Sequence, residues 1–481
     1  MLYRQKFDTF IRIYDDIGYV VHIGDFGDRV VSQSGAVFLS VLSREPQHLN
    51  TLTQKIATHF TGVTAEDIIS DVKDFYDMLV TDGFLTSGIT PEECNAHDTR
   101  FSYKALEPKT IKTDFTPVIL RAEKSTQEFL DNHFKDKPKL TNLQIELTSR
   151  CNERCVHCYI PHENKTDDIT PELFYATLNQ CRDIGVLNLT LSGGEPLLHK
   201  NFCEFLRKCK EYDFSVNILS NLTLLTDDII MEMKANRLSS VQVSLYSMNP
   251  SIHDAITQLP GSHERTKTNI LKLLDHDIPM QISCPTMKQN KNCFRDVIKW
   301  ANEHKIRATT DFIMMAKYDY TTDNLANRLA PSEVQTVITD IINHDTTYQD
   351  QLKQADFTQD KDTSNDIICG VCISTICMVA NGNVYPCAGW QDYVVGNIKD
   401  TPLIDIWNNS EKVKYLRSLR KKDFPKCLNC DDKAFCAMCM VRNANEGNGD
   451  PLKINEHFCT VAKINRNIVQ DWQRKTTGAY I

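Results

Sequence analysis

Hydrophobic and polar positions repeat in a regular order through the middle of the chain. Between residues 141 and 316, short apolar runs of strand length alternate with longer segments whose apolar residues recur every three to four positions. Six such units predict an α/β fold, a partial (β/α)6 TIM barrel with its site at the carboxyl ends of the strands. The predicted strands are 143–148, 186–191, 214–219, 239–245, 278–283 and 307–313, and predicted helices include 171–184, 201–211, 226–236, 265–275 and 293–303.

Residues 1–88 have a different pattern and predict a separate α+β unit. Three short β-rich runs predict a small antiparallel sheet, and three helical segments follow. In the third helix apolar residues at spacings of three and four make one buried stripe, and Thr64 and Asp67 stand where a capping-box pair would start it. Phe84 and Leu85 begin a further strand, as in a winged-helix-like domain. The runs are 11–14, 19–21 and 29–31, and the helices lie near 34–43, 51–60 and 64–81.

Two polar stretches separate the barrel from its neighbours. Residues 89–140 contain four prolines and no sustained apolar period, so we interpret them as a linker with one short helix near 121–134. Residues 317–365 predict a connector with a helical piece near 331–344. Residues 366–481 are rich in cysteine and form the last predicted domain.

Composition narrows the class of protein. The 481 residues are 41% hydrophobic and 24% charged, which is ordinary for a soluble globular protein. We find neither an apolar window of about 18 residues nor an apolar signal-peptide core at the start, so we expect a cytoplasmic protein without a membrane partner. The net charge of −9 argues against nucleic acid as a partner.

The chemical signal begins directly after the first barrel strand. Cys151, Cys155 and Cys158 follow it at the spacing C-x3-C-x2-C. Thiolates on such a loop can hold an Fe–S cluster, and three ligands leave one iron of a [4Fe–4S] cube open for a small molecule. A zinc site completed by His157 or His162 is the alternative, although closed zinc sites usually show four ligands in paired knuckles.

A second signal follows the next barrel strand. Gly193 and Gly194 end that strand, and without a Cβ they let a ligand lie against the backbone. Pro196 then fixes the turn, and Glu195 offers a carboxylate to a cationic amine. Such a loop alone is a weak motif, but one unit behind the C-x3-C-x2-C loop it is specific.

Together the two loops resemble the hallmark of the radical S-adenosylmethionine (radical SAM) superfamily. The resemblance implies that Cys151, Cys155 and Cys158 hold a [4Fe–4S] cluster, that S-adenosylmethionine chelates the open iron, and that the Gly193–Pro196 loop receives its amine. One-electron reduction then releases a 5′-deoxyadenosyl radical, with the hard chemistry supplied by the cofactor. Further candidate cofactor contacts are His157, Tyr159, Asn221, Ser244 and Arg265.

One of these contacts stands in a motif that departs from the family pattern, and two have structural alternatives. The third strand of the family often ends in Thr-Asn-Gly, whereas this chain has Ser220-Asn221-Leu222, which keeps the asparagine and loses the glycine. Ser244 matches a position that often meets the ribose or carboxylate of S-adenosylmethionine, and could equally be a capping hydroxyl. Arg265 either pairs with a carboxylate or is an ordinary surface arginine. No side chain stands out as a catalytic acid or base.

Nine of the 18 cysteines lie between residues 369 and 459, too dense for core packing. A tight turn at Asn381–Asn383 folds Cys387 back toward Cys372. Zinc ribbons are an alternative, because C-x2-C knuckles also suit zinc. We expect the scattered cysteines to be small core hydrophobes or incidental; they are Cys94, Cys181, Cys203, Cys209, Cys284 and Cys293.

The run C-x9-G-x4-C, made by Cys372, Gly382 and Cys387, resembles the SPASM extension of radical SAM enzymes. The resemblance implies two auxiliary [4Fe–4S] clusters, three clusters in all. Cys377 competes with Cys369, and the last pair is one residue closer than the family's C-x3-C spacing. The first set is Cys369, Cys372, Cys387 and Cys439, and the second is Cys427, Cys430, Cys436 and Cys459.

A winged-helix-like unit also suggests DNA binding as a function, but the negative charge of this unit argues against it. Residues 1–90 carry 7 Lys and Arg against 12 Asp and Glu, and only Lys73 offsets the acidic residues of the third helix. The unit instead resembles the PqqD-like peptide-recognition domain, related to the small chaperone of pyrroloquinoline quinone biosynthesis. That resemblance implies capture of a leader peptide as an added strand. A purely structural cap on the barrel is the alternative.

This order of parts resembles maturases of ribosomally synthesised peptides (RiPPs). It implies an oxidoreductase-type enzyme that binds a precursor peptide, takes electrons from flavodoxin or ferredoxin, and installs a cross-link. A thioether from a peptide Cys sulfur to carbon is the first choice, a C–C or C–O cross-link the second and epimerisation the third. A sulfatase-maturing oxidase leaves the first unit unexplained. The non-enzyme alternative is an Fe–S electron carrier or redox-sensing regulator. Such a protein does not need the Gly193–Pro196 loop beside the cysteine loop.

Overall fold

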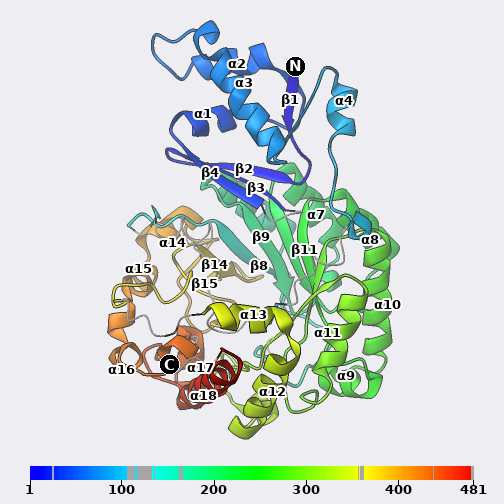
Figure 1. Ribbon diagram of the computed structural model, residues 1–481, viewed down its shortest axis with the longest axis vertical. Coiled ribbons are helices and arrows are strands. Elements are labelled where there is room, and N and C mark those ends of the chain that lie inside the picture. Colours follow the sequence, from blue (N-terminus) through cyan, green and yellow to red (C-terminus); the bar gives the residue numbers. More distant parts are fainter. Residues whose placement is uncertain are drawn as a thin grey trace.

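The computed structural model describes the chain except for residues 24–26, 106–113, 116–132, 135, 162–165, 356, 358–361, 437 and 478–481. The helix expected near 121–134 and the candidate zinc ligand His162 therefore lie outside the described residues. The N-terminal unit lies across one end of a curved sheet, and the C-terminal segment lies along one flank of that sheet (Figure 1). No described helix is long and apolar enough to cross a bilayer.

The N-terminal unit contains the predicted antiparallel meander and a second small sheet. In the first sheet the order is β2-β3-β4, and in the second β1 pairs with both β5 and β6. The predicted strand near Phe84 is β6, and its partner is β1, which was not predicted. The strands are β1 Leu2–Gln5, β2 Thr9–Tyr14, β3 Ile17–His22, β4 Gly27–Ser32, β5 Gln47–His48 and β6 Leu85–Gly88.

Helix α3, Ala65–Thr81, shows why this unit folds as its sequence predicts. The Thr64 side chain accepts from the Asp67 backbone and the Asp67 carboxylate accepts from the Thr64 backbone, which confirms the capping box. Val72 and Leu79 of the predicted stripe are fully buried against the core. The other helices here are α1 Ser34–Ser40, α2 Leu49–Ala57 and α4 Pro91–Ala96.

The central sheet contains all six predicted parallel strands in their chain order. Their alternation is regular: in β8 the side chains of Leu143, Ile145 and Leu147 enter the hydrophobic core, so Gln144 and Glu146 face the other way, into the barrel. The strands are β8 Asn142–Thr148, β9 Asn188–Gly193, β10 Ser215–Ser220, β11 Leu238–Ser244, β12 Met280–Ser283 and β13 Arg307–Thr310.

This sheet extends past the six predicted strands at both ends. β7, Asp114–Phe115, pairs in parallel with β13, although we expected that stretch to be a linker. At the other end β14, Thr375–Met378, pairs in parallel with β8, and β15 and β16 continue from it in antiparallel order. A strand of two residues is too short to leave a hydrophobic period. The last two strands are β15 Asn383–Tyr385 and β16 Gly396–Asn397.

Helices cover the outer face of the barrel and build the C-terminal segment. Of the barrel helices only α9 was not predicted, and its end supports the first cysteine loop. The barrel helices are α6 Pro171–Asp183, α7 Phe202–Glu211, α8 Asp227–Ala235, α9 Pro250–Thr257, α10 Ser262–Asp275 and α11 Phe294–Glu303. The later helices are α12 Pro331–His344, α13 Thr346–Gln354, α14 Leu403–Asn409, α15 Glu411–Ser418, α16 Pro425–Leu428, α17 Met440–Glu446 and α18 Glu456–Thr477. Short 3-10 turns are η1 Tyr103–Ala105, η3 Pro196–Leu198, η4 Asp323–Asn327, η5 Lys421–Asp423 and η6 Lys433–Phe435.

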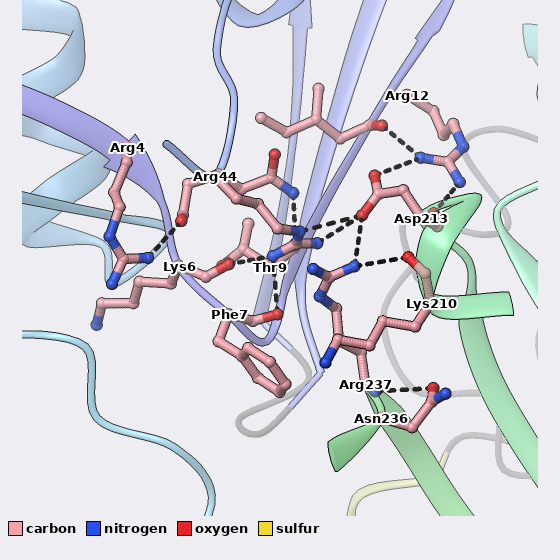
Figure 2. A network of polar contacts seen from close by, with 12 residues as sticks. Arg4, Lys6, Phe7, Thr9, Arg12, Arg44, Lys210, Asp213, Asn236 and Arg237 are labelled. Atoms are coloured by element: carbon pink, nitrogen blue, oxygen red, sulfur yellow. Dashed lines mark hydrogen bonds and ion pairs between the residues drawn. The ribbon is translucent and has the colours of Figure 1, made fainter. Parts of the chain in front are cut away.

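One carboxylate joins the N-terminal unit to the barrel. Asp213, in the turn between α7 and β10, pairs with Arg44 at 2.8 Å, Arg237 at 3.2 Å and Arg12 at 3.4 Å (Figure 2). Burial would raise the pKa of Asp213, but Arg44, Arg12 and Arg237 together hold it below its usual value. Because Arg12 and Arg44 come from the N-terminal unit, this network fixes that unit to the base of the barrel.

Candidate active site

The first three thiols lie on the loop that leaves β8 at its carboxyl end, as expected. Two backbone hydrogen bonds fix this loop against the end of α9: Arg154 donates to the Thr257 carbonyl and Val156 to the Ile256 carbonyl, each at 2.9 Å. A loop anchored through its backbone keeps its side chains available for ligands. Cys151, Cys155 and Cys158 are all partly exposed residues.

These three thiols also lie within electrostatic reach of one another. Burial raises the pKa of Cys155 well above its usual value, and the neighbouring charges of Glu153, Cys158 and Cys151 raise it further. Thiolates that repel each other in this way are stabilised when a cationic cluster binds them.

The two glycines of the second loop are required by the backbone of the first. A Cβ on Gly193, whose φ is +137°, would lie 2.1 Å from the Thr148 carbonyl oxygen, and one on Gly194 would lie 2.2 Å from that of Arg150. The N–H groups of Gly194 and Glu195 donate to these same two carbonyls at 2.8 and 2.9 Å. The expected reason, ligand contact, is therefore incomplete: the glycines let the two functional loops pack together.

Glu195 is turned into the protein. Its carboxylate accepts hydrogen bonds from the Ser220 hydroxyl at 2.7 Å, the Asn221 N–H at 2.8 Å and the Leu197 N–H at 3.0 Å. Burial raises the pKa of Glu195 to about 7, against the effect of these donors. These donors fix the carboxylate between β9 and β10, and its contact with the cofactor amine stays a prediction.

Asn221 connects the end of β10 to the first cysteine loop. Its amide donates to the Asn152 side chain at 3.0 Å, and its own Oδ1 accepts from the Thr223 N–H at 2.9 Å. The next residue, Leu222, has a φ of +57° where the family pattern has glycine. The leucine therefore adopts the left-handed conformation that the lost glycine would favour, with its side chain fully buried.

His157 and Ser244 meet at Tyr246, beside the cysteine loop. The His157 Nε2 lies 3.3 Å from the Tyr246 hydroxyl, and Ser244 hydrogen-bonds the same tyrosine. Burial lowers the pKa of His157 to about 4, so its ring is neutral, and its buried Nδ1 has no partner among the described residues. A neutral ring with an unsatisfied nitrogen suits a hydrogen bond to a polar ligand.

Glu153 is a site residue that the sequence analysis missed. Its side chain is buried, Oε2 accepts from the Cys155 thiol at 3.2 Å, and Oε1 has no partner among the described residues. Burial raises its pKa to about 7, while the charge of Arg265 lowers it. Arg265 itself is exposed and donates to the Pro260 carbonyl at 3.1 Å. The position of Glu153 inside the cysteine motif was the available signal.

The first C-terminal set brings together thiols that are far apart in the sequence. Burial raises the pKa of Cys372 to about 12; Arg417 opposes this, and Cys369 and Cys387 add to it. Burial also raises the pKa of Cys387, with a contribution from Cys439. Each expected member of this set is therefore within electrostatic reach of another member.

The second C-terminal set is likewise one group. Burial raises the pKa of Cys436 to about 11; Arg442 lowers it, and Cys427, Cys459 and Cys430 raise it further. This group packs between α16 and the start of α18, where the chain returns on itself.

Cys377 lies within the barrel sheet, and its thiol is within electrostatic reach of Cys387 of the first set. It sits on β14 opposite Gln144 of β8, in parallel register, and is fully buried. Its thiol donates to the Met378 carbonyl at 3.9 Å. This position favours Cys369 over Cys377 in the first set.

The spacing of the side chains bears on the zinc alternative. Among the residues that the structure describes, no three His, Cys, Asp or Glu side chains converge closely enough to hold a single metal ion. Zinc needs its ligands within about 2.3 Å of one ion, whereas a [4Fe–4S] cube spreads them over four irons.

Two family models match this chain. Residues 145–301 match the radical SAM superfamily, and residues 369–431 match an iron–sulfur cluster-binding domain, SPASM. An AdoMet-dependent heme synthase of Methanosarcina barkeri is 28% identical over 65% of this chain and 94% of its own length. The subtilosin biosynthesis protein AlbA of Bacillus subtilis is 24% identical over 64% of this chain and 69% of its own length.

Solved structures share the fold at low sequence identity. Streptococcus suis SuiB bound to its precursor peptide SuiA superposes with a TM-score of 0.60 and 16% identity, over 95% of this chain and 100% of SuiB. The anSMEcpe enzyme with bound AdoMet gives a TM-score of 0.55 and 17% identity, over 70% of this chain and 99% of its own. Residues 145–301 therefore form a radical SAM domain and residues 369–431 a SPASM domain, and these domains imply S-adenosylmethionine and [4Fe–4S] clusters as cofactors.

Proposed function

We propose that this enzyme modifies a ribosomally made precursor peptide by installing a cross-link, in the first instance a thioether from a Cys sulfur to a carbon. The observation that carries the proposal is the presence in one chain of the two packed functional loops, two further thiol sets and a separate N-terminal unit with its own sheets. Relatives in peptide pathways support it: the subtilosin protein AlbA, PqqA peptide cyclase and SuiB with its precursor peptide.

In this proposal Cys151, Cys155 and Cys158 hold the cluster that binds S-adenosylmethionine. When bound, that cofactor supplies the 5′-deoxyadenosyl radical. The backbone of the Gly193–Pro196 loop receives its amine. The unpartnered Nδ1 of His157 and Oε1 of Glu153 offer the remaining hydrogen-bonding groups, because buried polar atoms without partners are costly unless a ligand satisfies them.

The two C-terminal sets hold the auxiliary clusters. The first is Cys369, Cys372, Cys387 and Cys439, and the second is Cys427, Cys430, Cys436 and Cys459. An electron from the substrate leaves through one of them, and an external flavodoxin or ferredoxin supplies the electron that starts the reaction.

The N-terminal unit binds the leader of the peptide. Within the described residues its sheet ends at β2 and β4, and an extended segment can pair with such an edge. A cavity of about 930 Å³ lies beside β2 and is lined by Ile13 and Tyr14 on one side and Ile404 and Trp407 on the other. Ile13 and Ile404 are both substantially exposed, which suits apolar side chains of a peptide.

Turnover tests the reaction. Anaerobically reconstituted enzyme, given reductant, S-adenosylmethionine and the Cys-containing peptide encoded beside its gene, should release 5′-deoxyadenosine and a peptide lighter by two hydrogens. A thioether removes the thiol from alkylation, a carbon–carbon bond leaves it reactive, and epimerisation leaves the mass unchanged. The variant Cys155→Ala should release no 5′-deoxyadenosine. Wild-type enzyme that leaves the peptide unaltered would refute the proposal.

Hydrogen–deuterium exchange tests leader binding without altering the protein. Adding the leader peptide should slow amide exchange along β2 or β4, because new main-chain hydrogen bonds protect edge amides. Protection confined to the barrel would contradict the role of the N-terminal unit.

A further inference from the structure

Glu146 is a buried carboxyl group inside the barrel that no role described above explains. It lies on β8, five residues before Cys151, and its side chain is 3% exposed. Its neighbours Ile145 and Leu147 face the hydrophobic core under the helices, so the pleat of the strand directs Glu146 to the inner face. Active sites of barrel enzymes lie at the carboxyl ends of the strands, and Glu146 is two residues from that end of β8.

A residue from the C-terminal segment holds this carboxyl group. Gln391 Nε2 donates to Glu146 Oε1 at 2.7 Å, and this is the one hydrogen bond that the described residues give it. Gln391 follows Cys387 of the first auxiliary set by four residues. The strand pairing also places Cys377 of β14 on the same inner face, opposite Gln144.

The surroundings of Tyr159 locate Glu146 between two thiol sets. Burial raises the pKa of Tyr159 well above its usual value, and the charges of Glu146, Cys158, Cys377 and Cys387 raise it further, in that order. Cys158 belongs to the first cysteine loop and Cys387 to the first auxiliary set. Glu146 therefore lies on the strand that leads into the first cysteine loop, within electrostatic reach of Cys387 of the first auxiliary set.

The other buried carboxylates near the site are less suited to proton transfer. Glu195 already accepts three hydrogen bonds, and Glu153 lies against the Cys155 thiol. Asp311, after β13, accepts from the Ile313 N–H at 2.9 Å and remains the nearest rival.

We propose, building on the proposed function, that Glu146 is the proton acceptor of cross-link formation. Joining a C–H and an X–H group into a C–X bond removes two hydrogens from the peptide. One leaves as a hydrogen atom in 5′-deoxyadenosine. The other leaves as a proton to the Glu146 carboxylate, and the remaining electron passes to an auxiliary [4Fe–4S] cluster. Gln391 acts as a positioning residue for the carboxylate.

The ionisation of Glu146 agrees with this role. Burial raises its pKa to about 7, while the hydrogen bond from Gln391 lowers it. A general base is most effective when its pKa lies near the working pH.

The variant Glu146→Gln tests the proposal in the full enzyme, because a glutamine oxygen can still accept from Gln391. Transfer of deuterium from labelled peptide to 5′-deoxyadenosine should persist, while cross-linked product per 5′-deoxyadenosine falls about 100-fold or more. The substrate radical should accumulate in electron paramagnetic resonance spectra. Iron content and peptide affinity, measured by fluorescence anisotropy, should match those of the wild type.

Matched variants distinguish this result from a structural effect. Glu446→Gln changes a partly buried glutamate that pairs with Arg328 outside the barrel interior, and should keep wild-type coupling. Unchanged product per 5′-deoxyadenosine in Glu146→Gln would overturn the proposal, as would uncoupling by Asp311→Asn in its place. Lost iron or lost peptide binding in Glu146→Gln would assign it a structural role instead. A wild-type enzyme without product would refute the proposed function itself, so the two failures are separable.

Discussion

Close backbone packing determines which residue types can occupy the positions next to the first cysteine loop. Gly194 leaves no room for a side chain against Arg150, whereas Leu222 takes a left-handed conformation with its side chain buried. The difference has a physical cause: a leucine that adopts φ +57° loses about 1–2 kcal/mol but regains it through burial, whereas a Cβ on Gly194 would overlap a fixed carbonyl.

Gly194→Ala should disrupt the first cluster site. A Cβ 2.2 Å from the Arg150 carbonyl must displace the cysteine loop, which we expect to cost about 1–3 kcal/mol and to remove about four irons with all 5′-deoxyadenosine formation. Iron analysis and chemical denaturation measure both effects. Gly27→Ala is the matched control, because a Cβ there meets nothing within 4 Å. Full iron content in Gly194→Ala would contradict this account.

Glu146 should also make stability depend on pH. Burial raises its pKa from 4.5 to about 7, so the folded chain holds a proton that the unfolded chain releases in that window. The free energy of unfolding therefore falls as pH rises from about 4.5 to about 7, by on the order of 3 kcal/mol from this group. Glu146→Gln lacks this loss. In urea unfolding, the free energy of unfolding of the variant relative to that of the wild type should therefore be higher at about pH 8 than at about pH 5. Parallel profiles would contradict the prediction.

Strand β14 shows how an element of the C-terminal segment becomes part of the barrel. It pairs in parallel with β8, which places Cys377 within the sheet and leaves Cys369 and Cys372 on the loop before it. Sequence spacing treats Cys369 and Cys377 alike. The strand separates them, because a residue fixed in a ladder cannot swing toward a loop cluster.

Cys369→Ala and Cys377→Ala should therefore differ in iron content. Reconstituted wild-type enzyme should hold about twelve irons, and Cys377→Ala should keep them, since it only removes a buried thiol from the sheet. Cys369→Ala should lose the first auxiliary cluster and the corresponding paramagnetic signal. The opposite pattern would exchange the two assignments.

At the scale of the whole molecule, Asp213 connects the N-terminal unit to the barrel, two units whose sequences have different hydrophobic patterns. Four arginines pair with it, Arg12 and Arg44 from the N-terminal unit and Arg182 and Arg237 from the barrel, and burial lowers the pKa of Arg12 to about 10. Guanidinium groups at this distance repel one another without the carboxylate. Asp213 is therefore a central polar contact between the N-terminal unit and the barrel, beside the hydrogen bond from Arg12 to the Val186 carbonyl.

Asp213→Ala should lower the free energy of unfolding by about 2–4 kcal/mol. This is slightly less than the usual loss when one partner of a fully buried ion pair is removed, because the Asp213 side chain is partly exposed. It should also weaken the coupling between leader binding and turnover. Asp82→Ala is the control: it removes a partly exposed pair with Arg29 within the N-terminal unit and should cost about 0–1 kcal/mol. Urea denaturation of both variants measures the difference, and equal losses would contradict it.

The sequence by itself determined the chemistry and the local elements. The spacing of Cys151, Cys155 and Cys158 and the loop at Gly193 identify the superfamily, because ligand spacing and a glycine turn are local properties of the chain. The six barrel strands and α3 followed from periodicity for the same reason, since a hydrophobic period records which face of an element is buried.

Only the tertiary structure decided which distant groups meet. The hydrogen bonds of Glu195 to β10, the contact of Gln391 with Glu146 and the four arginines on Asp213 join residues that are far apart in the chain. The two auxiliary thiol sets interleave along the sequence, so spacing alone leaves the competition between Cys369 and Cys377 open. Such contacts depend on how strands pair and loops fold back, and no local pattern records them.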